Sequence, residues 1–454
     1  MGAKWYSDVL ANFTAQRDLI MRRSAEGIEQ ARKGNAHLIF VNEAGEALDH
    51  VQVEANQTKH DFQFGCTAFS IGGFDTDEKD ARFEAEFTNL FNMIVCPFLW
   101  DALEPVKGQP RYAADSPKIA RRPAPDLVCD FAEKNGLMVK GHALVYCGHA
   151  PEWIENDICG YKAQLEKHIE ELAERYAARV QDWDVVNESL GWFDRKNAAM
   201  RAKPLAFHHS DGYVEWCMRT ARKYFPHNNL FVNEGMGNLM SGGEYEFAYE
   251  RNPFLMQLKL LRLQGLEPDA AGLMLHLFLE KDQMKADLFN AENLYDALDY
   301  WTRFGMKLNL SELTVPAYST DEDDEQFQAE VVENLYRIWF GHPAINSIVW
   351  WNLADGTAYV DKVMNHDENR YHQGLIRRDF SRKPAYQALE RLIKHEWHTN
   401  ETGNTGSGSV FDLRGFYGSY DLTISRHGKT WKKQMYLSNQ NKQECTEHRI
   451  VLES

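Results

Sequence analysis

Between residues 62 and 351 the chain alternates short apolar runs with longer segments whose apolar residues recur at helical spacing. Short apolar runs bounded by turn residues are typical of buried strands, and a 3.6-residue spacing is typical of amphipathic helices. The clearest helical segment is YKAQLEKHIEELAERYAARV, at residues 161–180. The expected strands are residues 62–66, 91–96, 138–146, 180–187, 229–233, 270–276, 306–312 and 345–351.

Eight strands that alternate with helices predict a closed (β/α)8 TIM barrel. The alternative is an open doubly wound sheet, which usually carries a glycine-rich phosphate-binding turn after a first strand. The sequence has no such turn at that place. We therefore assign residues 63–397 to a barrel.

The two ends of the chain have other patterns. Residues 1–62 contain one helical segment, followed by two strands in which Val51 and Val53 alternate with polar residues. Residues 398–409, HTNETGNTGSGS, have the composition of a linker. Residues 410–454 alternate like short strands but are too few to form a stable sheet alone. We therefore expect both ends to build one small accessory β-sandwich beside the barrel.

Composition narrows the possible partners. The formal net charge of −17 disfavours a nucleic acid or an anionic membrane as partner, and no apolar run approaches the length of a membrane span. Seven cysteines are scattered without a C-x-x-C pair or zinc spacing, so we expect free thiols and no metal or cofactor. We also expect a monomer. No signal peptide is visible, which leaves a cytoplasmic and a secreted location open.

Polar and aromatic side chains gather where the expected strands end. In a (β/α)8 barrel the carboxyl ends of the strands surround the active site, so these side chains should meet there. Most of them are carboxylates, amides, imidazoles or indoles, without metal-ligand spacing. The candidates are Trp100, His142, Asn187, Glu188, Asn233, Glu234, His276, Glu312 and Trp351.

This set of side chains suits glycoside hydrolysis. That reaction needs a carboxylic acid beside the leaving oxygen and a second carboxylate near the anomeric carbon. The acid needs a raised pKa, whereas the nucleophile must stay ionised. A glutamate at a strand end is more often a cap or an ion-pair partner. The combination of Asn187–Glu188 at the fourth strand and Glu312 at the seventh favours a catalytic pair.

Several motifs, in order along the chain, resemble glycoside hydrolase family 10, the endo-β-1,4-xylanase family. The resemblance covers roughly residues 60–395 and includes WDVVNE at 183–188, which is similar to the acid/base signature of that family. The extra N- and C-terminal β segments resemble a divergent branch of the family. The other motifs are WDALEP (100–105), KGHALVYCGHAPEW (140–153), LFVNEG (230–235), LNLSEL (308–313) and WWNLADGTAY (350–359).

The resemblance implies a retaining glycosidase that acts on β-1,4-xylan or xylo-oligosaccharides by double displacement. By position, Glu188 is the acid/base and Glu312 is the nucleophile. Asn187 contacts the sugar at the cleavage point, and His276 holds or polarises the nucleophile. His142, Trp351 and Tyr359 line the subsite just before the scissile bond. We add Trp100, Tyr146, His149 and Asn233 as candidate substrate-binding residues.

The chain departs from the family pattern where the non-reducing-end sugars are held. Leu99 stands where a lysine is expected, and Tyr146 and His149 belong to a stretch that replaces a Trp-His-x-Gln pattern. Met274 replaces a glutamine, and Thr314 replaces the aspartate that would pair with the histidine beside the nucleophile. Two alternatives therefore stay open. One is a β-glycosidase for another glycan or glycoside, and the other is a carbohydrate-binding protein with weak catalysis.

Overall fold

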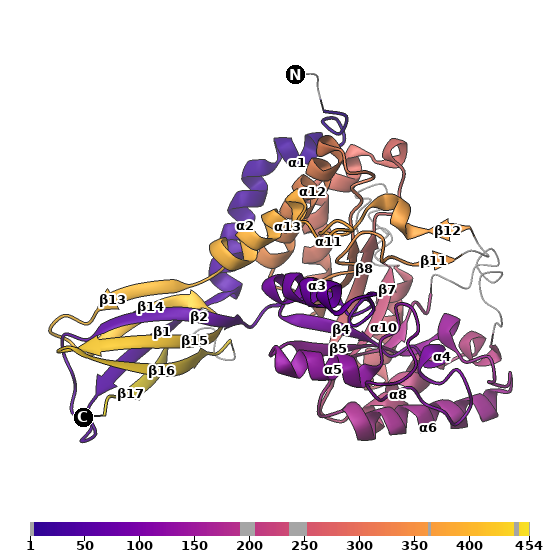
Figure 1. The fold of residues 1–454 in the computed structure, drawn as a ribbon, viewed down its shortest axis with the longest axis horizontal. Helices are drawn as coiled ribbons and strands as arrows, with labels where there is room; N and C mark the ends of the chain where they lie inside the picture. The colour runs from indigo at the N-terminus through magenta and orange to yellow at the C-terminus, as the bar shows by residue number, and fades with distance from the viewer. Residues whose placement is uncertain (1–3, 191–204, 236–251, 362–364, 440–444, 454) are drawn as a thin grey trace.

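The structure is a computed structural model, which describes residues 4–190, 205–235, 252–361, 365–439 and 445–453. The described residues form a closed barrel and a β-sandwich that projects from it (Figure 1).

The barrel contains eight parallel strands that close in the order β10-β3-β4-β5-β6-β7-β8-β9. Each overlaps one of the eight expected strands, so the predicted (β/α)8 barrel is confirmed and the open sheet is excluded. The strands are β3 Gln63–Thr67, β4 Met93–Pro97, β5 Met138–Tyr146, β6 Asp182–Asn187, β7 Asn229–Gly235, β8 Ala270–His276, β9 Lys307–Thr314 and β10 Ile345–Trp350.

Helices follow the strands and form the outer layer of the barrel. Local capping explains where several begin: Asn252 accepts the backbone N–H groups of Phe254 and Leu255, and Pro253 occupies the first helical position. The helices are α3 Asp77–Leu90, α4 Trp100–Leu103, α5 Pro125–Lys134, α6 Ile158–Tyr176, α8 Tyr213–Tyr224, α10 Pro253–Leu263, α11 Ala291–Arg303, α12 Glu322–Gly341 and α13 Pro384–Arg391.

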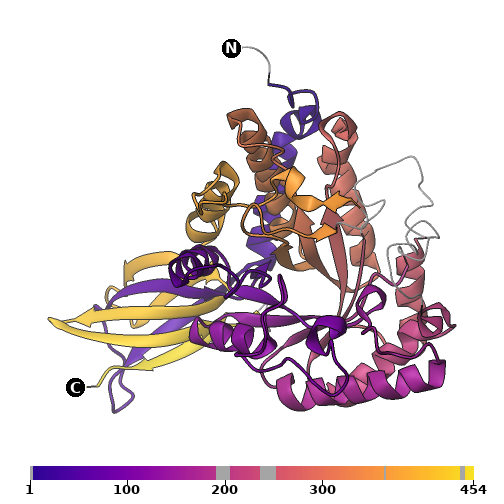
Figure 2. The ribbon, with the colours of Figure 1, turned by 45° about the vertical axis from the view of Figure 1, so that its right-hand side comes forward.

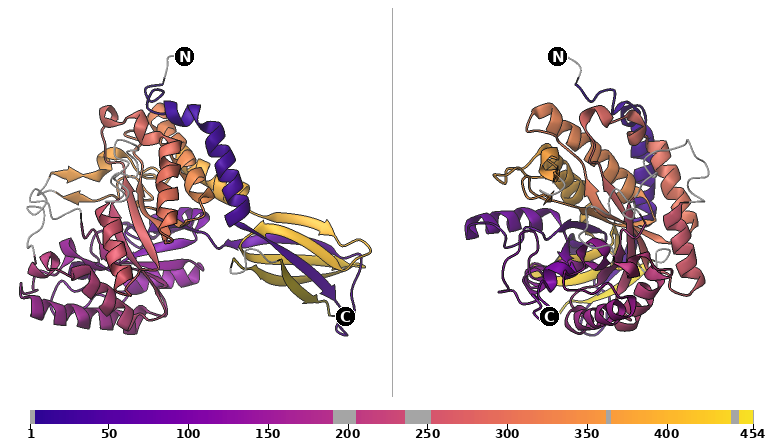
Figure 3. Two further views of the ribbon diagram at one scale, coloured as in Figure 1. Left: turned by 180° about the vertical axis from the view of Figure 1, so that it is seen from behind. Right: turned by 90° about the vertical axis from the view of Figure 1, so that its right-hand side faces the viewer.

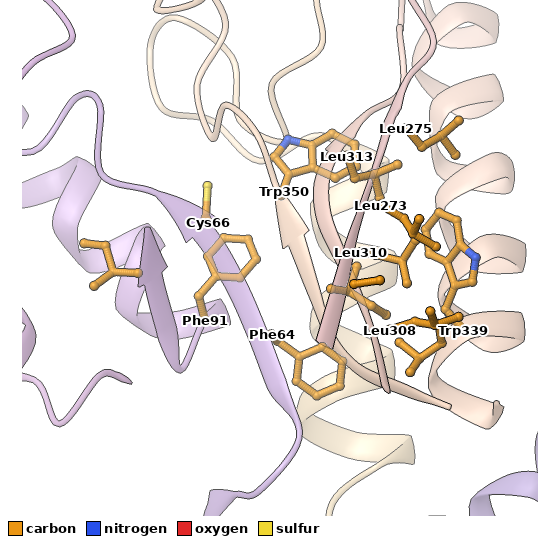
Figure 4. Close-up of a cluster of buried hydrophobic side chains, with 14 of the residues drawn as sticks. Phe64, Cys66, Phe91, Leu273, Leu275, Leu308, Leu310, Leu313, Trp339 and Trp350 are labelled. Carbon is orange, nitrogen blue, oxygen red and sulfur yellow. The ribbon is translucent and has the colours of Figure 1, made fainter. Parts of the chain in front are cut away.

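The main hydrophobic core lies between the strands and this outer layer. Figure 4 shows part of it, where Leu308 and Leu310 of β9 and Trp339 of α12 are close together, and all three side chains are buried. Inside the barrel a smaller cluster of Met93, Val95 and Val349 fills the interior. These layers hold the carboxyl ends of the strands in fixed relative positions.

The accessory β-sandwich is confirmed and uses strands from both chain ends. One sheet has the order β14-β1-β17 and the other has the order β13-β2-β15-β16. The side chains between the sheets include Leu38, Val53, Leu422 and Ile424, all buried. The strands are β1 Lys33–Val41, β2 Gln52–His60, β13 Asn400–Asn404, β14 Val410–Phe416, β15 Gly418–Arg426, β16 Lys429–Leu437 and β17 Thr446–Val451.

The prediction that residues 398–409 form a linker is wrong in part, because these residues include strand β13. This strand pairs antiparallel with β2, with Asn400 opposite Asn56 and Asn404 opposite Gln52. It lies at the edge of its sheet, and most of its side chains are exposed. Backbone pairing at a sheet edge needs no apolar side chains, so a Gly/Thr/Asn composition concealed the strand.

The N-terminal helical segment belongs with the barrel, so its assignment to the accessory module is also wrong. It forms α1 Ala11–Ala15 and α2 Arg17–Ala31. Helix α2 lies so close to α12 that a Cβ atom on Gly27 would sit 1.8 Å from the carbonyl oxygen of Gly341. Just after α2, the buried Arg32 donates to the carbonyls of Phe340, His342 and Ile345. The close packing of α2 on α12 and the hydrogen bonds of Arg32 hold the N-terminal helical segment against the barrel.

The sandwich lies at the end of the barrel where the strands begin. Strand β2 ends at His60 and β3 begins at Gln63, so the sandwich is joined to the amino end of the first barrel strand. The short pair β11 Val360–Asp361 and β12 His366–Asp367 lies on the far side of the barrel from the sandwich (Figures 2 and 3). In the described residues, no helix is long and apolar enough to cross a membrane.

Candidate active site

Two buried glutamates lie at the carboxyl ends of barrel strands β6 and β9, which are separated by β7 and β8. Glu188 directly follows β6 and is 7% exposed, and Glu312 lies near the end of β9 and is 4% exposed. Glu188 has a φ angle of 51°, in the left-handed region that non-glycine residues seldom adopt. Such backbone conformations cost free energy and cluster at functional sites.

Asn233 of β7 connects the two strand ends. Its Nδ2 donates to Glu312 Oε1 at 2.9 Å and to Asn187 Oδ1 at 2.7 Å. Its own Oδ1 accepts from the hydroxyl of Ser311. The side chain fits because Gly272 on β8 has no Cβ, which would lie 2.2 Å from Asn233 Oδ1. Asn233 is 0% exposed, so it holds the nucleophile candidate and does not face the substrate, unlike the expectation.

His276, at the end of β8, holds the other oxygen of Glu312. Its Nε2 lies 3.0 Å from Glu312 Oε2, and its Nδ1 lies 2.8 Å from the hydroxyl of Thr314. A neutral hydroxyl thus occupies the place where a carboxylate partner was expected. Burial opposes the charged imidazolium, but the hydrogen bond and the charge of Glu312 outweigh burial and raise the pKa of His276.

His142 reaches the same carboxylate from the opposite side. Its Nε2 lies 3.9 Å from Glu312 Oε1, while its Nδ1 lies 2.9 Å from Asp184 Oδ2. The other oxygen of Asp184 lies 2.9 Å from the Lys140 ammonium. Burial would raise the pKa of Asp184, but the Lys140 charge and the His142 contact outweigh it and lower that pKa.

The roles of Lys140 and Asp184 were not predicted from the sequence. A lysine and an aspartate within apolar strands could have revealed them, because buried charges are stable only when they are paired. The register of β5 and β6 places His142 directly beside Asp184. The pair therefore orients the imidazole next to Glu312.

Tyr146, the last residue of β5, contacts the acid/base candidate. Its hydroxyl donates to Glu188 Oε2 at 2.5 Å. Its ring lies 5.0 Å from the ring of His149, and His149 Nδ1 lies 2.9 Å from Asp101 Oδ2. The structure thus brings both predicted residues to the side of Glu188.

Glu234 stabilises the chain that follows Glu188. It accepts the backbone N–H of Leu190 at 2.8 Å, and the hydroxyl of Ser189 lies 3.5 Å from it. Burial raises the pKa of this carboxyl group despite those hydrogen bonds. Its contacts therefore indicate a structural role, in which it holds the backbone beside Glu188.

Trp351 lies between the two imidazoles. Its ring centroid is 5.4 Å from His142, 5.8 Å from His276 and 5.0 Å from Phe69. The indole is partly exposed, so one part of it is available to a ligand. Tyr359 follows on the loop after β10, where its hydroxyl donates to Asp361 at 3.1 Å.

Trp100 does not belong to the substrate-facing surface. Its side chain is only 4% exposed and stacks on His168 of α6, with ring centroids 4.4 Å apart. Its indole N–H donates to Glu104 at 3.1 Å. The prediction that Trp100 binds substrate is therefore wrong. The tryptophan follows a strand end, but it packs outward against α6.

A cavity of about 1210 Å³ opens beside these residues. Its walls are the segments after β3, β4 and β10, and it includes His149 and Tyr359. Within the described residues, no group of three or more His, Cys, Asp or Glu side chains could hold a metal ion. The arrangement therefore offers paired carboxylates, donors that fix one of them, and an adjoining space for a ligand.

Comparison with known proteins identifies the family. The model of glycosyl hydrolase family 10 matches residues 55–392. The anti-sigma-I factor RsgI6 of Acetivibrio thermocellus is 25% identical over 427 residues, which is 92% of this chain and 48% of that protein. A β-1,4-xylanase of Dictyoglomus thermophilum is 27% identical over 250 residues, 52% of this chain and 65% of that enzyme. The chain thus spans less than two thirds of either relative.

Solved structures have the same barrel. Xylanase 10B of Thermotoga petrophila, in complex with xylobiose, superposes with a TM-score of 0.58 at 20% identity, covering 74% of this chain and 95% of that chain. Xylanase 10B of Thermotoga maritima gives a TM-score of 0.57 at 20% identity, covering 74% and 96%. At this level of identity the likeness concerns the fold.

Proposed function

The chain belongs to glycosyl hydrolase family 10, and on that premise we propose that it is a retaining glycosidase that cleaves β-1,4-xylosidic bonds in xylan or xylo-oligosaccharides. The observation that carries this proposal is the fixation of Glu312. One of its oxygens accepts from Asn233, and the other lies 3.0 Å from His276. Because both of its oxygens are held, the carboxylate keeps one orientation and can attack the anomeric carbon of a sugar bound beside it.

Glu312 is the proposed nucleophile. Its carboxylate attacks the anomeric carbon, the bond to the leaving oxygen breaks, and a covalent glycosyl-enzyme forms. Asn233 and His276 contact both carboxylate oxygens, so the carboxylate is held in one orientation for the attack. Asn233 and His276 are positioning residues, because they act on the sugar only through Glu312.

Glu188 is the proposed acid/base. It protonates the leaving oxygen as the first bond breaks, and then takes a proton from the water that releases the sugar from Glu312. The Tyr146 hydroxyl, 2.5 Å from Glu188 Oε2, fixes the orientation of this carboxyl group.

The sugar just before the scissile bond is proposed to contact Asn187, His142, Trp351 and Tyr359. The Asn187 side-chain oxygen accepts from Asn233, so its Nδ2 is left to donate to a sugar hydroxyl. The partly exposed indole of Trp351 supplies an apolar surface for a sugar ring. A neutral or weakly charged polymer is compatible with a chain of net charge −17. We propose that the enzyme works as a monomer.

The test is a product profile after incubation with glucuronoxylan, arabinoxylan, xylo-oligosaccharides and aryl β-glycosides, with Glu312→Ala as the blank. Short xylo-oligosaccharides released by the wild-type chain alone are the expected result. Cleavage of an aryl β-glycoside without cleavage of any xylan would retain the glycosidase and refute the xylan substrate. Absence of turnover on every substrate, with glycan binding retained, would refute the enzymatic function.

A further inference from the structure

Three arginines line the cavity that adjoins the candidate site. Arg111, Arg121 and Arg122 all contribute to its wall, in a protein with a net charge of −17. The cavity shares Tyr359 with the proposed sugar subsite. Its wall also contains Phe69, whose ring contacts Trp351. A ligand bound at Trp351 can therefore extend directly into this cavity.

Two of these arginines flank the same aromatic ring. The guanidinium carbon of Arg121 lies 4.5 Å from the Phe69 ring centroid, and that of Arg122 lies 5.5 Å from it. Arg121 has a φ angle of 60°, and the backbone N–H of Arg122 donates to Ile119 at 3.0 Å. A tight turn with a left-handed residue thus presents two adjacent guanidinium groups to one cavity.

Only part of the Arg122 guanidinium is engaged in hydrogen bonds among the described residues. Its Nη1 donates to the Arg121 carbonyl at 2.9 Å, and within the described residues its Nε and Nη2 have no hydrogen-bond partner. Arg121 donates through Nη1 to Asn352 Oδ1 at 2.8 Å and to the Thr357 carbonyl, while its Nε is buried without a partner among the described residues. Both side chains are only partly exposed. Even partly buried cations cost free energy when they have no anionic partner.

The other cations of the cavity wall are already engaged, and the wall also includes the exposed carboxylate of Asp115. Arg111 donates to the carbonyls of Ala102 and Pro117, and Lys118 donates to the carbonyl of Gly72. These cations therefore hold the loop in place.

The nearby carboxylates do not neutralise the arginine pair. Asp101 interacts with the charge of Arg122, but its Oδ2 lies 2.9 Å from His149. Glu368 interacts with both arginines, yet it accepts the backbone N–H of Tyr359 and lies 3.7 Å from His366. Across the part of the chain that the structure describes, neither guanidinium has a carboxylate oxygen within ion-pair distance. The pair can therefore bind an anion from outside.

We propose that Arg122, supported by Arg121 and Phe69, binds the carboxylate of a uronic-acid sugar on the non-reducing side of the cleaved bond. A guanidinium presents parallel N–H groups that match the two oxygens of a carboxylate. This inference rests on the proposed function, because the side of the bond is set by Trp351 and Tyr359. The preferred substrate is then a xylan-like chain with acidic branches.

The experiment compares a xylo-oligosaccharide bearing one glucuronic-acid branch with the same molecule in which that carboxyl is reduced to a neutral hydroxymethyl group. Binding is measured by calorimetry on the full-length Glu312→Ala chain, and kcat/KM is measured on chains with Glu312 intact. We expect the acidic ligand to bind about tenfold more tightly or better. This preference should shrink as ionic strength rises from about 0.01 M to about 1 M, because salt screens partly exposed charges.

Arg122→Gln should reduce the acidic-to-neutral ratio to near one and leave the neutral ligand unchanged. The matched control is Arg82→Gln. Arg82 also lies beside a phenylalanine, 5.4 Å from the Phe380 ring centroid, and donates to a backbone carbonyl, that of Asp379. It is exposed and lies outside the cavity wall. The control should keep the wild-type ratio.

The outcomes separate this inference from the proposed function. If the chain with Arg122 intact bound the acidic and the neutral ligand with equal affinity, the inference would be overturned, even if both ligands were cleaved. An equal loss in Arg82→Gln and Arg122→Gln would overturn it as well. Preferential binding of a sulfate-ester sugar over the uronic acid would overturn the carboxylate assignment. Charge-dependent binding without any hydrolysis would support the anion site and refute the glycosidase.

Discussion

The floor of the site and the wall of the adjoining cavity are built in different ways. The floor is supplied by β5 to β9, and its groups contact one another directly: Asn233 and His276 hold Glu312, and Tyr146 holds Glu188. The wall consists of loop segments after β3, β4 and β10. Two of its arginines, Arg121 and Arg122, have free donor capacity among the described residues.

We infer from this difference that the strand residues carry out catalysis, whereas the loop residues determine which substrate is preferred. Side chains on strands are held within a packed core, so their geometry survives changes elsewhere in the sequence. Side chains on loops can change without disturbing the barrel. We expect substitutions in the floor to reduce turnover of every substrate, and substitutions in the wall to change which substrate is preferred.

The largest effect is expected for Glu312→Ala. Loss of the nucleophile should lower kcat by about 10⁴-fold or more on every glycan, because no covalent intermediate can form. Release of reducing sugar measures turnover, and circular dichroism checks the fold. Turnover near the wild-type level would remove Glu312 from this role.

Asn233→Ala should have the next largest effect. It removes the donor to Glu312 Oε1 and leaves Ser311 and Asn187 without their buried partner. We expect kcat to fall by about 10²-fold with a smaller change in KM, because the carboxylate loses its orientation rather than its charge. A rise in KM at constant kcat would instead indicate that Asn233 contacts substrate.

His276→Gln should change the pH dependence of stability. The pKa of His276 is raised in the folded state above its ordinary value of 6.5, so the folded protein binds the proton more tightly than the unfolded chain does. The resulting stabilisation is complete below about pH 6.5 and is lost as the pH rises through the raised folded-state pKa.

The free energy of unfolding of wild type and His276→Gln should therefore differ more at about pH 5.5 than at about pH 8.5. Urea denaturation at both values measures it. A difference that grows toward alkaline pH would mean that the imidazole is held neutral. Thr314→Val, which removes only the hydroxyl beside Nδ1, serves as the matched control.

Tyr359→Phe should have the smallest effect. It removes one hydroxyl from the cavity wall, whose contact is with Asp361 on the same loop. We expect KM for xylo-oligosaccharides to rise by a few-fold, roughly the value of one hydrogen bond, with kcat unchanged. A fall in kcat comparable to that of Asn233→Ala would instead mean that Tyr359 acts on catalysis, as the residues of the floor do.

The barrel was predictable because its strands are apolar runs with polar ends. The pair Glu188 and Glu312 stood out for the same reason, since each ends such a run. The small accessory sandwich followed from the shortness of both end segments.

Other features depend on contacts between distant segments. Strand β13 contains too few apolar residues to be recognised, and Trp100 faces α6 because of how α4 packs. The pairing of Lys140 with Asp184 depends on the register of neighbouring strands. The arginine pair lies in a loop without periodicity, where no sequence pattern indicates the direction of a side chain.

Glu312 and Glu188 are proposed to act by double displacement. Retaining enzymes need the two carboxyl groups about 5 to 5.5 Å apart, whereas inverting enzymes leave room for a water between them. The most direct test is a ¹H NMR time course on freshly cleaved xylo-oligosaccharide, which reports the anomer formed first. We predict that the β-anomer appears first and that the α-anomer grows in later by mutarotation. Initial formation of the α-anomer would contradict the covalent role of Glu312.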